Sequence, residues 1–214
     1  FKQKTAYEIP KRDWSSDVCS SDLGPVAVQP GAPGQPTRDV PAGASKTTPP
    51  AGVPADVLFM QGMIHHHAQA IEMASLLKTR TRSEAMKQLG LRIDISQTDE
   101  IKMMKQWLTD RGAEVPMDHG HGAMMINGAM MAQMPGMLSD AEMSALAKAS
   151  GTPFDRLFLD GMIRHHQGAL RMVADLRQQA WAAQESTMFD FTTHVDADQR
   201  MEITRMQQLL EALK

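Results

Sequence analysis

Two stretches of the chain carry the same helical pattern of apolar and polar positions. In residues 54–77, apolar side chains such as Phe59, Met63 and Leu77 fall on one stripe of a helix with 100° between residues. Residues 153–176 repeat the pattern, and twelve of the 24 aligned positions are identical. Both copies contain Gly-Met-Ile-x-His-His. The chain therefore contains an internal repeat whose unit begins with an amphipathic helix.

A second, weaker match follows each copy. Residues 94–108 and 196–210 share seven of 15 positions, again with helical spacing. Each unit is thus expected to be a helix, a short turn and a second helix. Two such hairpins would bury their apolar stripes against one another, so the pattern predicts an all-α fold, a four-helix bundle.

Local signals mark the expected ends of these helices. Proline suits the first helical position, a Ser or Thr with a Glu three residues later forms a capping box, and glycine ends helices. The expected start signals are Pro54, Pro153 with Thr152 as its cap, the capping box Thr81 to Glu84, and the capping box Ser139 to Glu142 of a short helix that reaches about Ala149. Gly112 is expected to end the second helix.

The chain divides into three parts on this basis. Residues 1–23 have no helix or strand periodicity and resemble translated sequencing read-through, so we treat them as non-native and expect a signal peptide or lipid anchor to be lost with the true start. Residues 24–53 are rich in Pro and Gly and are expected to form a disordered linker. Residues 54–214 are the bundle domain, with hairpins at 54–112 and 153–214 and a connector at 113–152.

The amino-acid composition argues against some classes of function and favours another. The net charge is −3, which argues against an electrostatic nucleic-acid binder, and no apolar run is long enough to span a membrane. The chain holds 19 Met and 8 His but a single cysteine, Cys19. A Met usually fills gaps in a core, but so many also suit a protein that binds soft metal ions by thioether and imidazole groups.

The repeated motif supplies the first set of candidate ligands. His66 and His67 flank the apolar stripe and follow Met63 by three and four residues, which places them on neighbouring helical positions. The candidate metal ligands of the two copies are Met63, His66, His67, Met73, Met162, His165, His166 and Met172. Buried structural hydrogen bonding by these histidines is the alternative interpretation.

The second helices carry repeated polar residues on a core-facing stripe. Gln97 and Glu100 are followed by Met104, and Gln199 and Glu202 by Met206, so both methionines join the candidate ligands. A buried carboxylate needs a partner, and an imidazole N–H held by Glu100 or Glu202 would orient a ligating histidine. The alternative is that both glutamates lie at a solvated edge of the bundle.

The connector is the third feature. It combines clustered thioethers with a His-x-His, which suits Cu(I) or Ag(I), and the two histidines also suit Cu(II). The candidate ligands there are Met117, His119, His121, Met124, Met125, Met130, Met131, Met134 and Met137. The alternative is that the connector is an apolar loop that packs over the bundle. Zinc sites that need several cysteines are excluded.

The repeated Asp-x-x-Phe-x-x-x-Met-Ile-x-His-His-x-x-Ala-x-x-Met resembles domain-of-unknown-function family 305, over residues 54–214. The resemblance implies a ferritin-like four-helix fold and, from copper-resistance members of the bacterial periplasm, an exported protein that binds copper, with Cu(I) favoured, for sequestration, transfer or resistance. It implies metal ions and other copper-handling proteins as partners, with self-association left open. Asp56 and Asp155 belong to the same motif and are assigned, with the two glutamates, to the surroundings of the metal.

Three functions stay open at this point. A metal-binding protein is favoured, a metal-free structural or interaction bundle is the second, and a di-iron oxidoreductase is the third. The di-iron class needs two Glu-x-x-His pairs and two further inward Glu, which the repeated helices lack. No catalytic motif is present, so we expect a protein without enzymatic activity.

Overall fold

The computed structural model describes residues 27–29, 36, 38–40, 53–116, 125–126, 129–130 and 134–213. The chain divides into two units, residues 1–48 and residues 49–214. In the first, β1 (Ala27–Gln29) pairs with β2 (Arg38–Val40) in an antiparallel manner. This short pairing lies inside the proline-rich stretch, where the sequence did not predict a strand.

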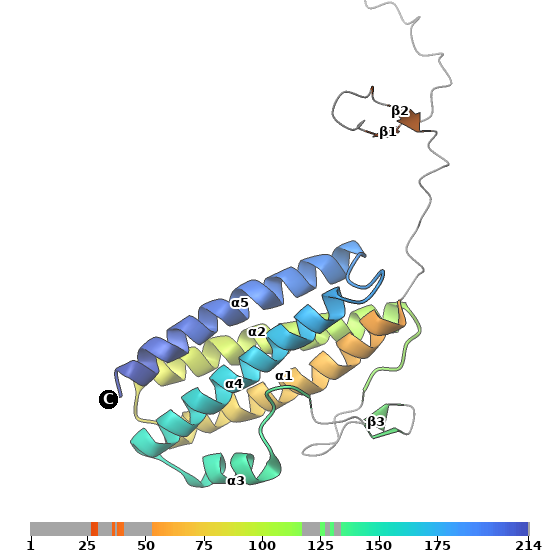
Figure 1. Ribbon diagram of the computed structural model, residues 1–214. Coiled ribbons are helices and arrows are strands. Elements are labelled where there is room, and N and C mark those ends of the chain that lie inside the picture. The colour runs from red at the N-terminus through yellow and green to blue at the C-terminus, as the bar shows by residue number, and fades with distance from the viewer. Residues whose placement is uncertain are drawn as a thin grey trace, which may run out of the picture. The chain divides into compact units, whose positions relative to one another are not determined.

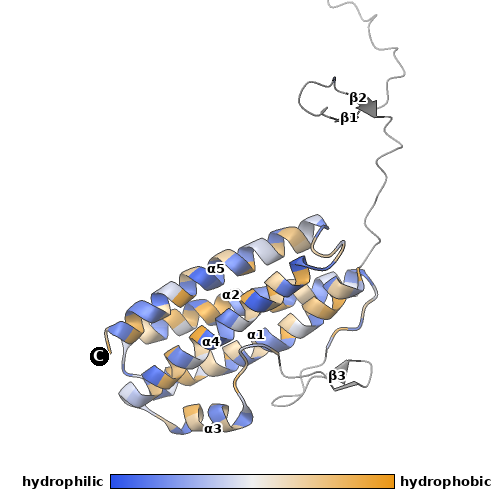
Figure 2. Cartoon of the chain, in the orientation of Figure 1, coloured by the Kyte–Doolittle hydropathy of each residue, from blue (hydrophilic) through white to orange (hydrophobic). Residues whose placement is uncertain are grey.

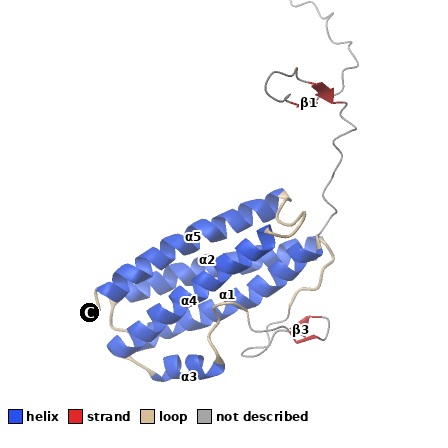
Figure 3. Cartoon of the chain, viewed as in Figure 1, coloured by secondary structure: helices blue, strands red, loops and turns tan. Residues whose placement is uncertain are grey.

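Four long helices form the second unit and run side by side (Figures 1 and 3). They are α1 (Pro54–Arg80), α2 (Glu84–Asp110), α4 (Gly151–Arg177) and α5 (Ser186–Glu211). Helix α1 packs on α2 and α4 packs on α5, and the two hairpins meet mainly through α1 and α4. The predicted all-α four-helix bundle is therefore confirmed. The short helix α3 (Asp140–Lys148) packs against α1 and α4.

The connector between the hairpins contains one further pairing. The two-residue strands β3 (Met125–Ile126) and β4 (Ala129–Met130) are antiparallel neighbours. In the part of the chain that the structure describes, no helix is long and apolar enough to cross a membrane.

Two of the predicted helix ends are confirmed. Ser139 caps α3 in a complete capping box with Glu142, and Gly112 follows α2 with φ 62°, a conformation that glycine adopts at little cost. Two other predictions are wrong. Helix α2 is capped by Ser83, which directly precedes its first residue and whose Oγ accepts from the Met86 N–H, whereas the Oγ1 of Thr81 accepts the Ser83 N–H outside the helix.

The start of α4 is the second error. The helix begins at Gly151, so Thr152 and Pro153 lie within its first turn instead of marking its boundary. Proline is tolerated in the first turn because the N–H groups there have no intrahelical acceptor, so a proline does not fix the first residue uniquely. Gly151 has φ 61°, which lets the chain turn sharply into the helix from the nearby end of α3.

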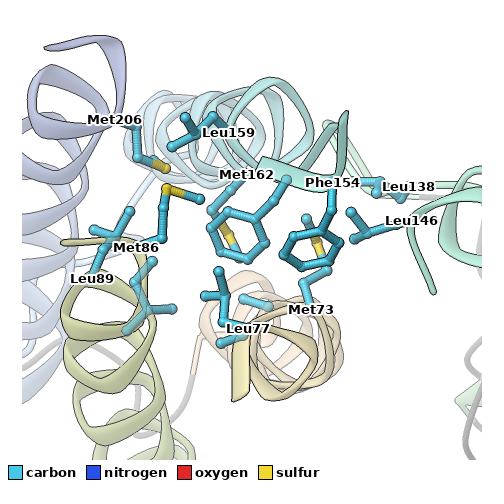
Figure 4. Close-up of a cluster of buried hydrophobic side chains, with 14 of the residues drawn as sticks. Met73, Leu77, Met86, Leu89, Leu138, Leu146, Phe154, Leu159, Met162 and Met206 are labelled. Atoms are coloured by element: carbon cyan, nitrogen blue, oxygen red, sulfur yellow. The ribbon is translucent and has the colours of Figure 1, made fainter. Parts of the chain in front are cut away.

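The apolar core consists of two clusters with a polar layer between them. One cluster, shown in Figure 4, contains Met73, Leu77 and Phe154 among its members, and the other contains Phe59, Met63 and Trp107. Along α1 and α4, the paired histidines fall between the residues of the two clusters. Figure 2 shows polar and apolar residues mixed along each helix, as expected of helices that bury one side only.

Candidate functional site

Four histidines lie fully buried in the centre of the bundle. His66 and His67 come from α1, and His165 and His166 come from α4. The rings of His66 and His165 stack with centroids 3.8 Å apart at 37°. The two copies of the motif therefore meet at the contact between the hairpins, where one histidine of each pair touches its counterpart.

The outer histidine of each pair contacts a glutamate of the neighbouring helix. The Nε2 of His67 lies 2.6 Å from Oε2 of Glu100, and the Nε2 of His166 lies 2.6 Å from Oε2 of Glu202. Because a carboxylate only accepts, each imidazole donates its Nε2–H in these bonds. The side chain of Glu100 is 20% exposed and that of Glu202 is 8% exposed. The pairing of these glutamates with histidines, expected from the sequence, is present in both copies.

The inner histidines donate to backbone carbonyls. The Nε2–H of His66 reaches the carbonyl oxygen of Pro135 at 3.1 Å, and that of His165 reaches the carbonyl oxygen of His66 at 3.0 Å. Burial, reinforced by the neighbouring His67, lowers the pKa of His66 to about 3. Burial and the adjacent His66 lower the pKa of His165 well below its ordinary value. Both rings are therefore neutral at pH 7, with a proton on Nε2 and a lone pair on Nδ1.

Several polar atoms of this layer have no hydrogen-bond partner in the part of the chain that the structure describes. They are the buried Nδ1 atoms of all four histidines and the Oε1 atoms of Gln97 and Gln199. Each unsatisfied buried polar atom costs about 1–3 kcal/mol. A neutral imidazole nitrogen with a free lone pair is a ligand for copper and silver ions, so these residues fit a soft metal.

The buried methionines of the helices pack with apolar neighbours. Met73, Met162 and Met206 belong to the cluster of Figure 4, and Met63 and Met104 belong to the other cluster. All five are fully buried. Among the described residues, no three His, Cys, Asp or Glu side chains converge on a point that could hold a metal ion. A metal held at this layer would therefore take fewer than three ligands of these four kinds from the described residues, and thioether sulfur could complete the set.

The two aspartates of the motif have different surroundings. The Oδ1 of Asp56 accepts the backbone N–H of Ala183, at 2.9 Å, in the turn between α4 and α5. Burial is the main reason why the pKa of Asp56 is raised. Asp155 is buried, and its Oδ1 has no hydrogen-bond partner among the described residues. Neither aspartate bonds to one of the four buried histidines, so Asp56 orients a turn while the role of Asp155 stays a prediction.

The end of the connector is held against the bundle, and we call residues 134–138 the strap. Gln69 of α1 binds its backbone twice, because Nε2 donates to the Leu138 carbonyl at 2.9 Å and Oε1 accepts the Leu138 N–H at 2.7 Å. Gly136 has φ 80°, and a methyl group on it would lie 2.3 Å from the Arg164 carbonyl. The strap also provides the carbonyl group that His66 binds.

Sequence reasoning missed Gln69. Its counterpart in the second copy is Gly168, where a methyl group would lie 1.9 Å from the Pro135 carbonyl. One copy thus holds the strap with a side chain, and the other makes room for it by lacking one. In the aligned repeats, a polar residue in one copy stands at the position of a glycine in the other. This difference was the signal that could have revealed the contact.

Five of the nine connector candidates lie outside the described residues. Met117, His119, His121, Met124 and Met131 are not described, and Met125 and Met130 are described only as strand residues. Their proposed role as ligands stays a prediction. Met134 and Met137 lie in the strap, half-buried.

The described bundle is similar to several solved structures. A fragment from Deinococcus radiodurans is 28% identical, with a TM-score of 0.64, and the match covers 76% of this chain and 99% of that one. A protein of Streptomyces coelicolor, named as a secreted protein, is 26% identical with a TM-score of 0.64, and the match covers 74% of this chain and 93% of that one. CopM in its Cu(I)-bound form is 27% identical with a TM-score of 0.57, over 73% of this chain and 96% of CopM.

The match to curated proteins is shorter. An uncharacterized protein of Acanthamoeba polyphaga mimivirus, L153, is 41% identical over 56 residues, which are 26% of this chain and 37% of that protein. The family model described as "Domain of unknown function (DUF305)" matches residues 56–210, which include all four long helices and both histidine pairs. The chain therefore belongs to the DUF305 family.

Proposed function

We propose that this protein binds copper, as Cu(I), with Ag(I) accepted in its place. The observation that carries the proposal is the set of four buried Nδ1 atoms that have no hydrogen-bond partner among the described residues. Burial keeps the inner pair of histidines neutral, and a neutral imidazole can coordinate a metal without first losing a proton. The inner histidines therefore need no deprotonation step to accept a cation at neutral pH.

The glutamates support the same function. A carboxylate that holds one ring nitrogen fixes the tautomer and makes the other nitrogen a better ligand. Glu100 and Glu202 make this contact with His67 and His166 at 2.6 Å. With their Nε2 atoms engaged, the outer histidines would present Nδ1 to a metal.

The solved relatives point the same way. Structures of CopM are named as Cu(I)-bound, Cu(II)-bound and Ag-bound forms, at 27%, 29% and 28% identity to this chain. We propose the same class of cargo here, in an exported protein that sequesters copper or hands it to another copper-handling protein. We propose no catalytic step. Thioether and imidazole ligands suit an oxidising compartment because, unlike thiolates, they are not lost to disulfides.

A titration with Cu(I) against a competing chelator tests this proposal. The protein should bind Cu(I) more tightly than a Met-poor four-helix bundle of similar size does. The double variant His66→Ala with His165→Ala should lose the bundle site, whereas replacing Met124, Met125, Met130 and Met131 by Leu should remove only connector sites. Binding no tighter than the control bundle would refute the proposal.

A metal-free structural bundle is the second candidate function. The observation that favours it is that every Nε2 atom of the four histidines already has a protein partner. In that case, buried water would donate to the Nδ1 atoms. The same titration separates the two functions, because a structural bundle would bind no Cu(I) in excess of the control.

A further inference from the structure

Each copy of the motif has a glycine whose missing side chain lets side chains of other elements come close to the backbone, and we call the space that they fill the hollow over that glycine. The glycines are Gly62 and Gly161, one turn before the inner histidines. A methyl group on Gly62 would lie 3.5 Å from Cε of Met172, and one on Gly161 would lie 3.3 Å from Cε of Met73. A methionine of the opposite helix therefore fills part of each hollow.

The strap completes the two hollows differently. Over Gly62 it places Met134, whose Sδ would lie 3.3 Å from a methyl group on that glycine. Over Gly161 it places Leu138, whose Cδ2 would lie 3.2 Å from a methyl group there. The ends of two methionine side chains thus lie next to the first glycine, and the ends of one methionine and one leucine lie next to the second.

Exposure separates the hollows further. Met134 and Met172 are both half-buried, so the first pair of thioethers is within reach of solvent. Met73 is fully buried and Leu138 is 5% exposed, so the side chains at the second hollow belong to the buried apolar core. A metal ion can enter only where ligands are accessible, and a sealed apolar contact gains more from dispersion than from a charge.

We propose that the hollow over Gly62 is a site for Cu(I) or Ag(I), with Met134 and Met172 as its thioether ligands. The hollow over Gly161 is its closed counterpart and binds no metal. Soft monovalent ions accept few ligands at undemanding geometry, which two flexible methionines can satisfy.

We assign the Nδ1 of His66, one turn further along α1, as a third ligand. It is buried with no hydrogen-bond partner among the described residues, and long side chains of a helix lean toward the preceding turn, which here contains Gly62. The Nε2–H of the same ring is held by the carbonyl of Pro135, the residue after Met134. The strap therefore positions a sulfur ligand and orients the imidazole together.

This site rests on the proposed function and makes it specific. The test uses the full chain with methionines labelled at the ε-methyl carbon and Ag(I) as the probe, followed by NMR. The signals of Met134 and Met172 should shift together, within the same equivalent of Ag(I), while the signal of Met73 stays in place. The apparent affinity of the site is read from the Met172 signal.

Matched variants separate ligation from packing. Met134→Leu should weaken Ag(I) binding at Met172 at least about tenfold. Loss of a residue that only orients a ligand already lowers metal affinity about 10–100-fold, and Met134 is proposed as a ligand itself. Met73→Leu removes a thioether from the other hollow and should leave that affinity within about twofold. Gly62→Ala should weaken binding and Gly161→Ala should not, although both add the same methyl group against similarly close neighbours.

The outcomes are distinguishable. If the protein binds Ag(I) and Cu(I) but the Met134 and Met172 signals move at different equivalents or not at all, this site is wrong and the proposed function stands. An unchanged affinity in Met134→Leu has the same meaning. If the unaltered protein binds neither ion more tightly than the control bundle, the proposed function fails, and the site with it.

Discussion

The two histidine–glutamate bonds offer a matched comparison, because they have the same length in different surroundings. Glu202→Ala removes the acceptor that the described residues provide for the His166 Nε2–H, at a place where the glutamate is 8% exposed. An unsatisfied buried donor costs about 1–3 kcal/mol, and bonds to charged groups lie toward the upper end. We expect the free energy of unfolding to fall by about 2–3 kcal/mol. Glu100→Ala should cost about 1 kcal/mol, because Glu100 is 20% exposed and water can replace it.

Urea unfolding followed by circular dichroism measures both losses, at neutral pH and with a chelator present so that metal does not contribute. A double variant, Glu202→Ala with His166→Phe, provides the control. Removing both partners of a buried hydrogen bond leaves no unsatisfied donor, so the double variant should recover about 1 kcal/mol relative to Glu202→Ala. Equal losses for the two glutamates, or a double variant no more stable than the single one, would refute this reasoning.

Three further predictions concern the same region. Because burial lowers the pKa of His66 to about 3 and that of His165 well below its ordinary value near 6.5, the unfolded chain binds more protons in acid. The free energy of unfolding should therefore be highest above pH about 6.5. Below that pH it should fall by about 1.4 kcal/mol for each pH unit and each of the two histidines. A urea midpoint that stays constant from pH 7 to 5 would contradict this prediction. Asp56→Ala should cost about 1–2 kcal/mol because it frees a buried backbone N–H, whereas Asp155→Ala, which removes an unpaired oxygen, should cost less in the same assay. Gly168→Ala should displace the strap, seen as faster hydrogen exchange at its backbone amides with little change in α5; unaltered exchange would count against the close approach.

The histidine–glutamate pairs show how far sequence reasoning could go. A glutamate repeated on a core-facing stripe needs a partner, and the repeated histidines were the polar groups most able to provide one. That argument used only helical periodicity and the cost of burying charge. It did not reveal that the inner histidines stack on each other. That contact joins α1 and α4, which lie far apart in the sequence, so it depends on how the two hairpins pack.

The errors at the helix starts have a related cause. Thr81 and Ser83 are both residue types that cap helices, and Ser83 is the cap because the helical backbone begins at Glu84. Pro153 suits any position of a first turn, so it marks the start of α4 only to within a turn. Backbone geometry decides between such neighbouring residues, and local sequence patterns do not specify that geometry.

By itself, the sequence determined the helical class and the two helical hairpins, because periodicity is a property of single helices that local spacing encodes. It offered pairing between the repeated histidines and glutamates as one of two alternatives. Only the tertiary structure decided which ring nitrogens are occupied and where the strap lies. It also made two similar glycines into different sites. Gly62 and Gly161 have equivalent neighbours in the repeat, yet one faces Met134 and the other Leu138. The strap is not repeated, so the asymmetry it imposes on a duplicated bundle arises only when it packs against both copies.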